Sequence, residues 1–175
     1  MKLAHRLKLL ATALLAMATF AACASQRPLN AGEEVYLVVR HAEKGNDDRR
    51  DPSLSVAGQT RAIELARIAA AKPLVAAYAT SFKRTQQTAQ PSAEASGIAV
   101  TTYDAAMSAA DFAAELRRMH PHGVTLVVGH SNTVPEIAAA LCACSVAPME
   151  ESEYDRLYEV RFDSDGHPYM LARRY

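Results

Sequence analysis

The fold of this chain is decided by the stretch VYLVVRHAEK at residues 35–44. Its first five residues are apolar, and four of them are β-branched or aromatic, which favours a pleated and tightly packed strand. Because apolar and polar side chains do not alternate, we expect both faces of this strand to be covered, as in a parallel sheet. The apolar run ends at Arg40, and His41 and a charged loop follow. We therefore expect a reactive histidine at the edge of a sheet.

Strand and helix patterns alternate along the rest of the chain. Further strands are predicted at residues 74–79, 98–102, 124–128, 154–162 and 169–173, and helices at 56–71, 82–95 and 109–120. A fourth helix is predicted to begin after Ser131 or Asn132, with Pro135 in its first turn, and to continue to Cys142. Ser55 is expected to cap the first helix. Repeated alternation of this kind indicates an α/β fold, a three-layer α/β/α sandwich with a mostly parallel central sheet.

Chemically reactive residues follow three of the predicted strands. Arg40 and His41 follow the first, residues 81–84 follow the second, and Gly129 and His130 follow the fourth. Ligands of such sheets bind beyond the carboxyl ends of the strands, so we expect the three groups to line one edge.

Two arginines and two histidines at one edge suit a phosphoryl group, because guanidinium groups match phosphate oxygens and a neutral imidazole can attack phosphorus. Lys83 and Arg84 lie in the first turn of a predicted helix, where the helix dipole disfavours cations. A phosphate bound at the start of the helix would reconcile them.

These segments together resemble a known family. RHAEK at residues 40–44, SFKRTQQTA at 81–89 and VGHSN at 128–132 are similar to motifs of the histidine phosphatase superfamily, phosphoglycerate mutase-like branch, and DPSLS at 51–55 resembles the segment before its first helix. The resemblance implies a phosphoglycerate mutase-like sandwich. It also implies His41 as the nucleophile, and it implies that Arg40, Arg84 and His130 bind the transferred phosphoryl group.

The resemblance leaves the remaining site residues less defined. The family commonly uses an acid that protonates the leaving oxygen, and Asp104 stands in about the right place, with Glu43 and Asp111 as alternatives. Glu43 also matches the motif, and it is expected either to contribute to the phosphate site or to order its loop. Ser81 and Asn132 are expected either at the edge of the pocket or as caps of the helices that follow them, and Ser131 is the alternative cap for the helix after Asn132.

The N-terminal part of the chain predicts export. Residues 1–22 combine a basic start with an apolar run of about 14 residues, which suits a signal peptide and is too short to span a bilayer. Cys23 follows in the position of a lipidated cysteine, so we expect a lipid-anchored periplasmic protein; the alternative is ordinary cleavage, which would release a soluble one. Residues 23–33 then form a tether, and 34–175 form the catalytic domain.

Composition argues against several other classes. The first 22 residues hold three basic residues, which leaves 16 lysines and arginines against 19 acidic residues in the rest, and the pI is about 7.0, so nothing suggests a nucleic acid partner. Cys142 and Cys144 are separated by one residue, a spacing expected to strain a disulfide, and we expect them to pack at a helix end. His120 and His122 flank a proline and are expected in a loop. No metal or other cofactor is needed.

The function predicted from the sequence is hydrolysis of a small phosphate monoester in the cell envelope, by a histidine acid phosphatase type of mechanism. Two alternatives remain at this stage. One is a non-catalytic envelope module that binds a phosphorylated glycan or lipid, and the other is a phosphomutase. The identity of the substrate and the oligomeric state are not indicated by the sequence.

Overall fold

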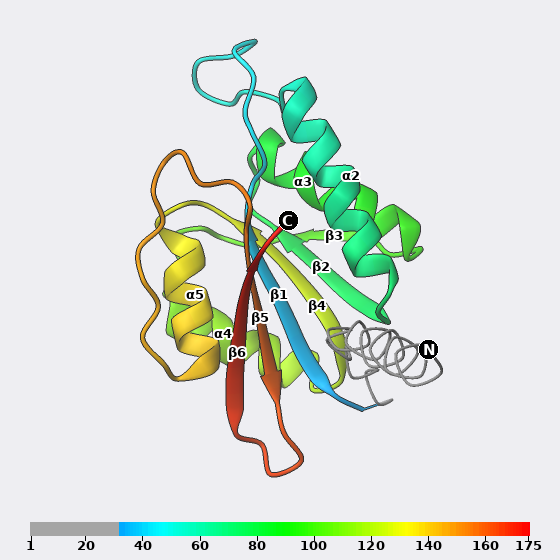
Figure 1. Cartoon of the computed structure of the whole chain (residues 1–175), viewed down its shortest axis with the longest axis vertical. Helices are drawn as coiled ribbons and strands as arrows, with labels where there is room; N and C mark the ends of the chain where they lie inside the picture. Colours follow the sequence, from blue (N-terminus) through cyan, green and yellow to red (C-terminus); the bar gives the residue numbers. More distant parts are fainter. Residues whose placement is uncertain (1–31) are drawn as a thin grey trace, which may run out of the picture.

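The protein is represented by a computed structural model, of which residues 32–175 are described. Its centre is one six-stranded sheet with the strand order β3-β2-β4-β1-β5-β6 (Figure 1). β3, β2, β4 and β1 run parallel to one another, β5 is antiparallel to β1, and β6 is antiparallel to β5. The predicted mostly parallel sheet is therefore confirmed.

The elements alternate as the sequence pattern predicted. The strands are β1 (Glu34–Arg40), β2 (Leu74–Ala79), β3 (Val100–Thr102), β4 (Gly123–Gly129), β5 (Arg156–Phe162) and β6 (Pro168–Arg174). The helices are α2 (Val56–Ala70), α3 (Lys83–Ala95), α4 (Ala109–Met119) and α5 (Thr133–Cys142). Ser55 caps α2 as expected, because its side chain accepts a hydrogen bond from the Gly58 amide. The third strand is shorter than predicted and begins at Val100 rather than at Ile98.

Helices cover both faces of the sheet and complete the three layers (Figure 1). One core contains alternate residues of β1, such as Val35 and Leu37, with residues of α2 and α3 such as Leu65. The other core contains Tyr36 and Val38 of β1 with residues of α4 and α5. Successive strand residues point to opposite faces, so both sets must be apolar when both faces are covered. This explains the uninterrupted apolar run at residues 35–39.

The predictions for the N-terminal segment cannot be compared with the structure. The signal peptide (1–22), the lipidated Cys23 and most of the tether (23–33) lie outside the described residues. Between residues 32 and 175, none of the helices is both long enough and apolar enough to cross a bilayer.

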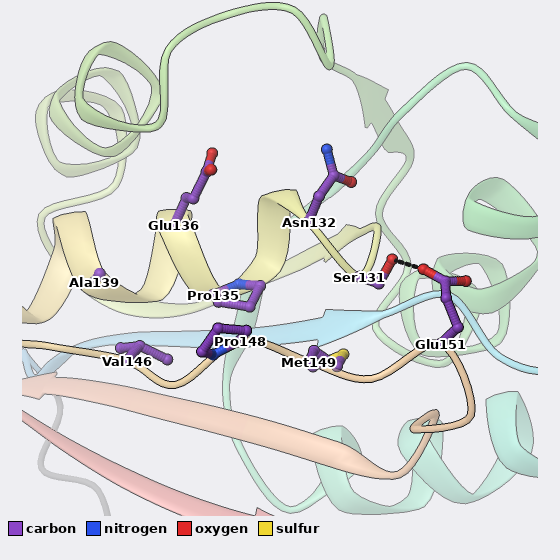
Figure 2. A pocket seen from close by; sticks show the side chains of 9 residues that line it. All are labelled: Ser131, Asn132, Pro135, Glu136, Ala139, Val146, Pro148, Met149 and Glu151. Carbon is purple, nitrogen blue, oxygen red and sulfur yellow. Dashed lines mark hydrogen bonds between the residues drawn. The ribbon is translucent and has the colours of Figure 1, made fainter.

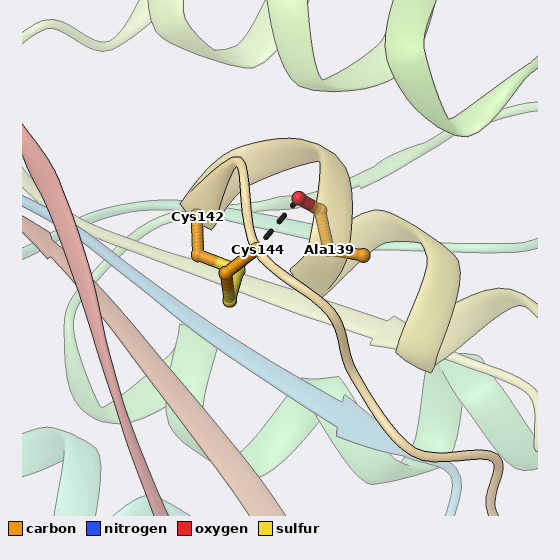
Figure 3. The surroundings of a disulfide bond; sticks show 3 residues. All are labelled: Ala139, Cys142 and Cys144. Carbon is orange, nitrogen blue, oxygen red and sulfur yellow. Dashed lines mark hydrogen bonds between the residues drawn. A yellow bond between two sulfur atoms is a disulfide. The ribbon is translucent and has the colours of Figure 1, made fainter.

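The prediction for Cys142 and Cys144 is wrong, because the two residues form a disulfide (Figure 3). Ala143 between them adopts a left-handed conformation with φ of 50°, which ends α5 and reverses the chain. The two Cα atoms thereby come within 5.1 Å, inside the range that a disulfide spans. The spacing of one residue suggested a strained disulfide, because the sequence does not show that the chain reverses at Ala143.

Candidate active site

The three groups of reactive residues meet at one edge of the sheet, as predicted. β1 and β4 are neighbours in register, and the His41 amide donates to the Gly129 carbonyl at 2.9 Å just beyond the paired strands. His130 follows Gly129, so the two imidazoles emerge side by side, with ring centroids 5.5 Å apart. β2 is the other neighbour of β4, and it brings Thr80 and the start of α3 to the same edge.

His41 is buried, with 3% of its surface exposed. Its Nδ1 atom lies 2.8 Å from the carbonyl oxygen of Ala42. A carbonyl oxygen only accepts, so Nδ1 carries the proton and Nε2 keeps its lone pair. Burial, together with the nearby charges of Arg40 and Arg84, lowers the pKa of His41 to about 3. The side chain is therefore a neutral imidazole with a free Nε2, which is the form that a nucleophile requires.

His130 is the second imidazole of the site. Burial and the charges of Arg84 and Arg40 lower its pKa to about 4. Its Nε2 atom lies 3.0 Å from the hydroxyl of Thr80, and the ring packs edge-on against Phe82. His130 is therefore also neutral near pH 7, and Thr80 holds its orientation.

Arg84 lies in the first turn of α3 and is mostly buried. Its guanidinium carbon stands 4.3 Å from the centroid of the Phe82 ring, and burial lowers its pKa. The same Phe82 ring lies 5.3 Å from the His130 ring, centroid to centroid, so this cation lies near the second imidazole, and its charge lowers the pKa of both His41 and His130. An anion bound against the two imidazoles would therefore meet Arg84.

The start of α3 already has an anion of its own. The Asp51 carboxylate accepts a hydrogen bond from the Lys83 amide at 2.9 Å and lies 3.8 Å from Arg84. The sequence suggested that a bound phosphate would reconcile the basic first turn with the helix dipole. In the structure Asp51 does so instead, because a carboxylate at a helix N-terminus satisfies both the amide and the dipole.

Arg40 is fully buried, and its guanidinium holds the loop that precedes β5. Nη1 donates to the backbone carbonyls of Glu150, Glu151 and Glu153 at 2.8 to 3.1 Å, and Nη2 pairs with the Glu151 carboxylate at 2.9 Å. Tyr154 stacks on the guanidinium at 4.2 Å. Of the three guanidinium nitrogens of Arg40, Nε alone is buried without a hydrogen-bond partner among residues 32–175. Arg40 is therefore chiefly an anchor for this loop, and Nε is the donor that it has left for a ligand.

Glu43 is engaged away from the two imidazoles. Arg61 of α2 donates to both carboxylate oxygens at 2.7 to 3.0 Å and also to the carbonyl of Tyr175. The Arg61 hydrogen bonds lower the pKa of Glu43. α2 approaches this loop so closely that a Cβ on Gly58 would lie 2.2 Å from the Glu43 carbonyl oxygen. Of the two roles expected for Glu43, these contacts fit the ordering of its loop.

Asp104 lies on an exposed turn after β3, at the same edge of the sheet. Its carboxylate accepts a hydrogen bond from the Ala106 amide, and among the described residues it has no hydrogen bond with either imidazole. The alternative acid Asp111 is bound to Ser108 at the start of α4. The role of Asp104 as proton donor therefore stays a prediction.

Asn132 and Ser131 lie at the start of α5, and neither side chain caps the helix. Asn132 is exposed and makes no capping hydrogen bond. Ser131 instead donates to the Glu151 carboxylate, as Figure 2 shows. The His130 amide donates to the Thr133 hydroxyl at 3.0 Å. Both residues thus lie at the edge of the site, where the contribution of Asn132 to binding remains a prediction.

Several site residues were not predicted from the sequence. Thr80 directly follows β2, and this position at a strand end is the signal from which it could have been predicted. Thr88 accepts a hydrogen bond from the Ala42 amide, and it stands within the segment that resembles the family. Glu151 and Tyr154 lie in a loop without periodic structure, and no local pattern indicates that Arg40 binds this loop.

The described residues offer one group suited to a metal ion, formed by Asp163, Asp165 and His167. All three are exposed on the turn between β5 and β6. β5 runs antiparallel to β1, so this turn lies at the end of the sheet opposite to His41. It takes no part in the site described above.

Comparisons with known proteins agree with this geometry. The family model described as histidine phosphatase superfamily (branch 1) matches residues 36–108, a range that includes Arg40, His41 and Arg84. The resemblance predicted from the motifs is therefore confirmed. A comparison with curated proteins gives no match.

Solved structures show the same fold. The protein histidine phosphatase SixA complexed with tungstate is 16% identical, with a TM-score of 0.67 over 81% of this chain and 97% of that one. The mycobacterial glucosyl-3-phosphoglycerate phosphatase Rv2419c is 15% identical, with a TM-score of 0.60 over 83% and 99% of the two chains. A protein described as mycobacterial hydrolase 1 is 17% identical, with a TM-score of 0.60 over the same shares. These matches confirm the phosphoglycerate mutase-like sandwich.

Proposed function

We propose, on the premise that this chain belongs to the histidine phosphatase superfamily, that it hydrolyses phosphate monoesters through a phosphohistidine on His41. The observation that carries this proposal is the contact between His41 Nδ1 and the Ala42 carbonyl, which leaves Nε2 unprotonated. A second neutral imidazole and a mostly buried arginine stand beside it. This combination provides a nucleophile and a positive environment for the group that it attacks.

The reaction would proceed in two steps. The Nε2 lone pair of His41 forms a bond to phosphorus while the bond from phosphorus to the ester oxygen breaks, and the released alkoxide takes up a proton to leave as the alcohol. Water then attacks the phosphohistidine, the P–N bond breaks, and inorganic phosphate leaves. Arg84 and the free Nε of Arg40 would stabilise the charge that develops on the phosphoryl oxygens. The hydrogen bond to Ala42 would keep the His41 ring oriented through both steps.

The names of structural neighbours support a phosphatase. SixA is a protein histidine phosphatase and Rv2419c is a glucosyl-3-phosphoglycerate phosphatase. Their substrates differ, and their identity to this chain is too low to carry either substrate over. A phosphatase with a histidine nucleophile acting on a small phosphorylated substrate is the function that their names have in common with this site.

The proposed location is the bacterial cell envelope, reached by export through residues 1–22 and held by a lipid on Cys23. The basic and then apolar start of the chain supports export. The disulfide between Cys142 and Cys144 fits the same location, because disulfides persist in oxidising compartments. Mass spectrometry of the membrane fraction is expected to find a diacylated Cys23, whereas an unmodified soluble product would contradict the anchor.

A binding module without catalysis is the second candidate. It is favoured by one observation: within residues 32–175, no carboxylate is hydrogen-bonded to either imidazole. Such a module would bind a phosphorylated glycan or lipid in the same pocket and release it unchanged.

One experiment separates the two candidates. The purified protein is incubated with a radiolabelled aryl phosphate, quenched in alkali and examined for an alkali-stable phosphoprotein, while release of inorganic phosphate is measured in parallel. We expect label and turnover in the wild type and in His167→Ala, which changes an exposed histidine at the far end of the sheet, and neither in His41→Ala. If the wild type binds the aryl phosphate but shows neither a labelled phosphoprotein nor release of phosphate, only the non-catalytic binding module remains. Undiminished turnover in His41→Ala would mean that another residue is the nucleophile.

A further inference from the structure

A pocket opens between α5 and the loop that precedes β5, beginning at Ser131, the residue after His130 (Figure 2). Its volume is about 490 Å³, within the range of about 300 to 1,000 Å³ that is typical of small-molecule sites. Its lining consists of Ser131, Asn132, Pro135, Glu136, Ala139, Val146, Pro148, Met149 and Glu151. The pocket is therefore large enough for an organic group of several carbon atoms.

Two lining residues connect the pocket to the candidate active site. Ser131 follows His130 in the chain, and Glu151 pairs with Arg40 at 2.9 Å. Ser131 also donates a hydrogen bond to the Glu151 carboxylate, so this pair forms the boundary between the candidate active site and the pocket. A phosphate ester whose phosphorus lies at His41 would pass this pair for its organic part to enter the pocket.

Most of the lining is apolar. Pro135 belongs to α5, while Val146, Pro148 and Met149 belong to the facing loop. The disulfide closes the C-terminal end of α5 immediately before this loop begins (Figure 3). Methylene groups of a ligand would leave water on entering such a pocket, and their burial favours binding.

The charged residues of the pocket are all acidic. Glu136 and Glu151 line it, and no lysine or arginine does. Glu151 is compensated by its pair with Arg40, and the Lys44 charge also acts on it. Glu136 makes no ion pair with any residue between 32 and 175, so the uncompensated charge of the pocket is negative.

We propose that this pocket receives the alcohol part of the substrate and selects a phosphate monoester whose alcohol carries an ammonium group on an apolar chain. The proposal rests on the phosphatase function proposed above. The apolar chain lies against Pro135, Val146 and Met149, and the ammonium group faces the Glu136 carboxylate. A carboxylate or a second phosphate on the alcohol would be repelled in the same place, because the Glu136 carboxylate attracts a cation and repels an anion.

Three esters of equal chain length test the proposal: aminohexyl, hydroxyhexyl and carboxypentyl phosphate. Their terminal charges are distant from the ester oxygen, so their leaving groups are closely matched. For the wild type we expect kcat/KM to decrease in that order, with about tenfold between the first and the last. In Glu136→Gln this ratio should fall about three- to fivefold, and added salt should reduce the wild-type ratio through screening. Glu115→Gln is the control, since it removes an exposed carboxylate of α4 that does not line the pocket, and it should leave the ratio unchanged.

Binding of the same esters to His41→Ala, measured by titration calorimetry, separates the two proposals. If the wild type hydrolyses none of the esters, the proposed phosphatase function fails. The order of the dissociation constants measured with His41→Ala still tests the pocket. The proposal for the pocket is supported if the affinities for His41→Ala follow the same order of the three esters and if an added Glu136→Gln change reduces the differences between them. Equal affinities, a preference for the carboxylate, or a ratio that Glu136→Gln does not alter would overturn it.

Discussion

The Nδ1 atom of His41 lies 2.8 Å from the carbonyl oxygen of Ala42, the next residue in the chain, and this contact fixes which ring nitrogen is free. The ring is also buried between Arg40, Arg84 and His130, which keeps it neutral. The same environment that prepares the nucleophile has a consequence for stability, because a histidine that cannot charge in the folded state can charge once the chain unfolds.

The first prediction concerns stability below neutral pH. The pKa of His41 is lowered from 6.5 to about 3, so between these values the unfolded chain binds a proton that the folded protein does not. Stability is therefore expected to decrease as the pH falls through this window. His41→Ala removes this contribution, and its loss of unfolding free energy between pH 7 and pH 4 should be smaller than that of the wild type by about 2 to 3 kcal/mol.

Urea denaturation at pH 7, 5.5 and 4 measures this difference. His167→Ala is the control, because His167 is exposed on the turn between β5 and β6. It should follow the wild type. Parallel curves for the wild type and His41→Ala would show that the folded protein protonates His41 as readily as the unfolded chain does.

The second prediction compares two neighbouring cations of α3. The side chain of Arg84 is 15% exposed, whereas that of Lys83 is 51% exposed. A charge-assisted hydrogen bond from a mostly buried guanidinium to a phosphoryl oxygen contributes about 1.5 to 3 kcal/mol. Arg84→Ala should therefore reduce kcat/KM for an aryl phosphate, and weaken inhibition by vanadate, by about 10- to 100-fold. Lys83→Ala should change both by less than about threefold. Equal effects of the two changes would rule out a specific role for Arg84.

A third prediction follows from the carboxylate at the start of α3. Asp51 binds the Lys83 amide and lies 3.8 Å from Arg84, where it opposes the approach of another anion. Asp51→Asn retains an oxygen for the amide and removes the charge, so inhibition by inorganic phosphate should strengthen about two- to fivefold. The control is Asp47→Asn, since Asp47 lies in the same loop and binds the Ser53 amide instead. Weaker inhibition in Asp51→Asn would mean that Asp51 positions Arg84 and does not compete with phosphate.

The fourth prediction tests Asp104 as the proton donor. An acid assists the departure of an alkyl alcohol far more than that of an aryl alcohol, whose oxygen leaves without a proton. Asp104→Asn should therefore slow hydrolysis of an alkyl phosphate at least about tenfold and change that of nitrophenyl phosphate by less than about threefold. Asp111→Asn is the matched control, because its carboxylate is bound to Ser108. If Asp104→Asn slows neither ester, the leaving alkoxide receives its proton from another source.

The sequence was sufficient to predict the layers and the meeting of Arg40, His41, Arg84 and His130. Each of these depends on a regular pattern: an apolar run, a helical period, or the rule that parallel strands end at one edge. The resemblance to the family added their expected roles, and the geometry is compatible with those for His41 and Arg84.

The contacts of irregular segments could not be predicted. Arg40 was expected to bind phosphate, yet most of its hydrogen bonds go to the loop around Glu151, more than 100 positions later in the chain. Asp51 occupies the helix start that a phosphate was expected to fill. The disulfide depends on the left-handed backbone of Ala143, which alanine rarely adopts. In all three cases tertiary structure brings together groups that no local periodicity relates.

The last prediction concerns the proton on His130. The Thr85 hydroxyl lies 2.7 Å from the Phe82 carbonyl and 3.0 Å from the Thr80 carbonyl, so its proton is directed to a carbonyl oxygen. In its 2.8 Å contact with the Thr80 hydroxyl, Thr85 must then be the acceptor and Thr80 the donor. The Thr80 oxygen is thereby left to accept from His130 Nε2 at 3.0 Å. This chain of hydrogen bonds assigns the His130 proton to Nε2 and leaves Nδ1 unprotonated, so Thr80 is a positioning residue for the second imidazole.

Thr80→Val keeps the shape of this buried side chain and removes its hydroxyl. We expect kcat to fall about tenfold, since one neutral hydrogen bond that orients a site residue is worth about 1 kcal/mol or somewhat more. The decisive readout is the ¹⁵N shifts of the His130 ring, which should report a proton on Nε2 in the wild type and a mixture of both neutral forms in Thr80→Val. Thr80→Ser restores the hydroxyl and should restore both the shifts and most of the rate. A ring protonated on Nδ1 in the wild type would contradict the assignment, and a slow Thr80→Val variant with wild-type shifts would reduce Thr80 to a packing role.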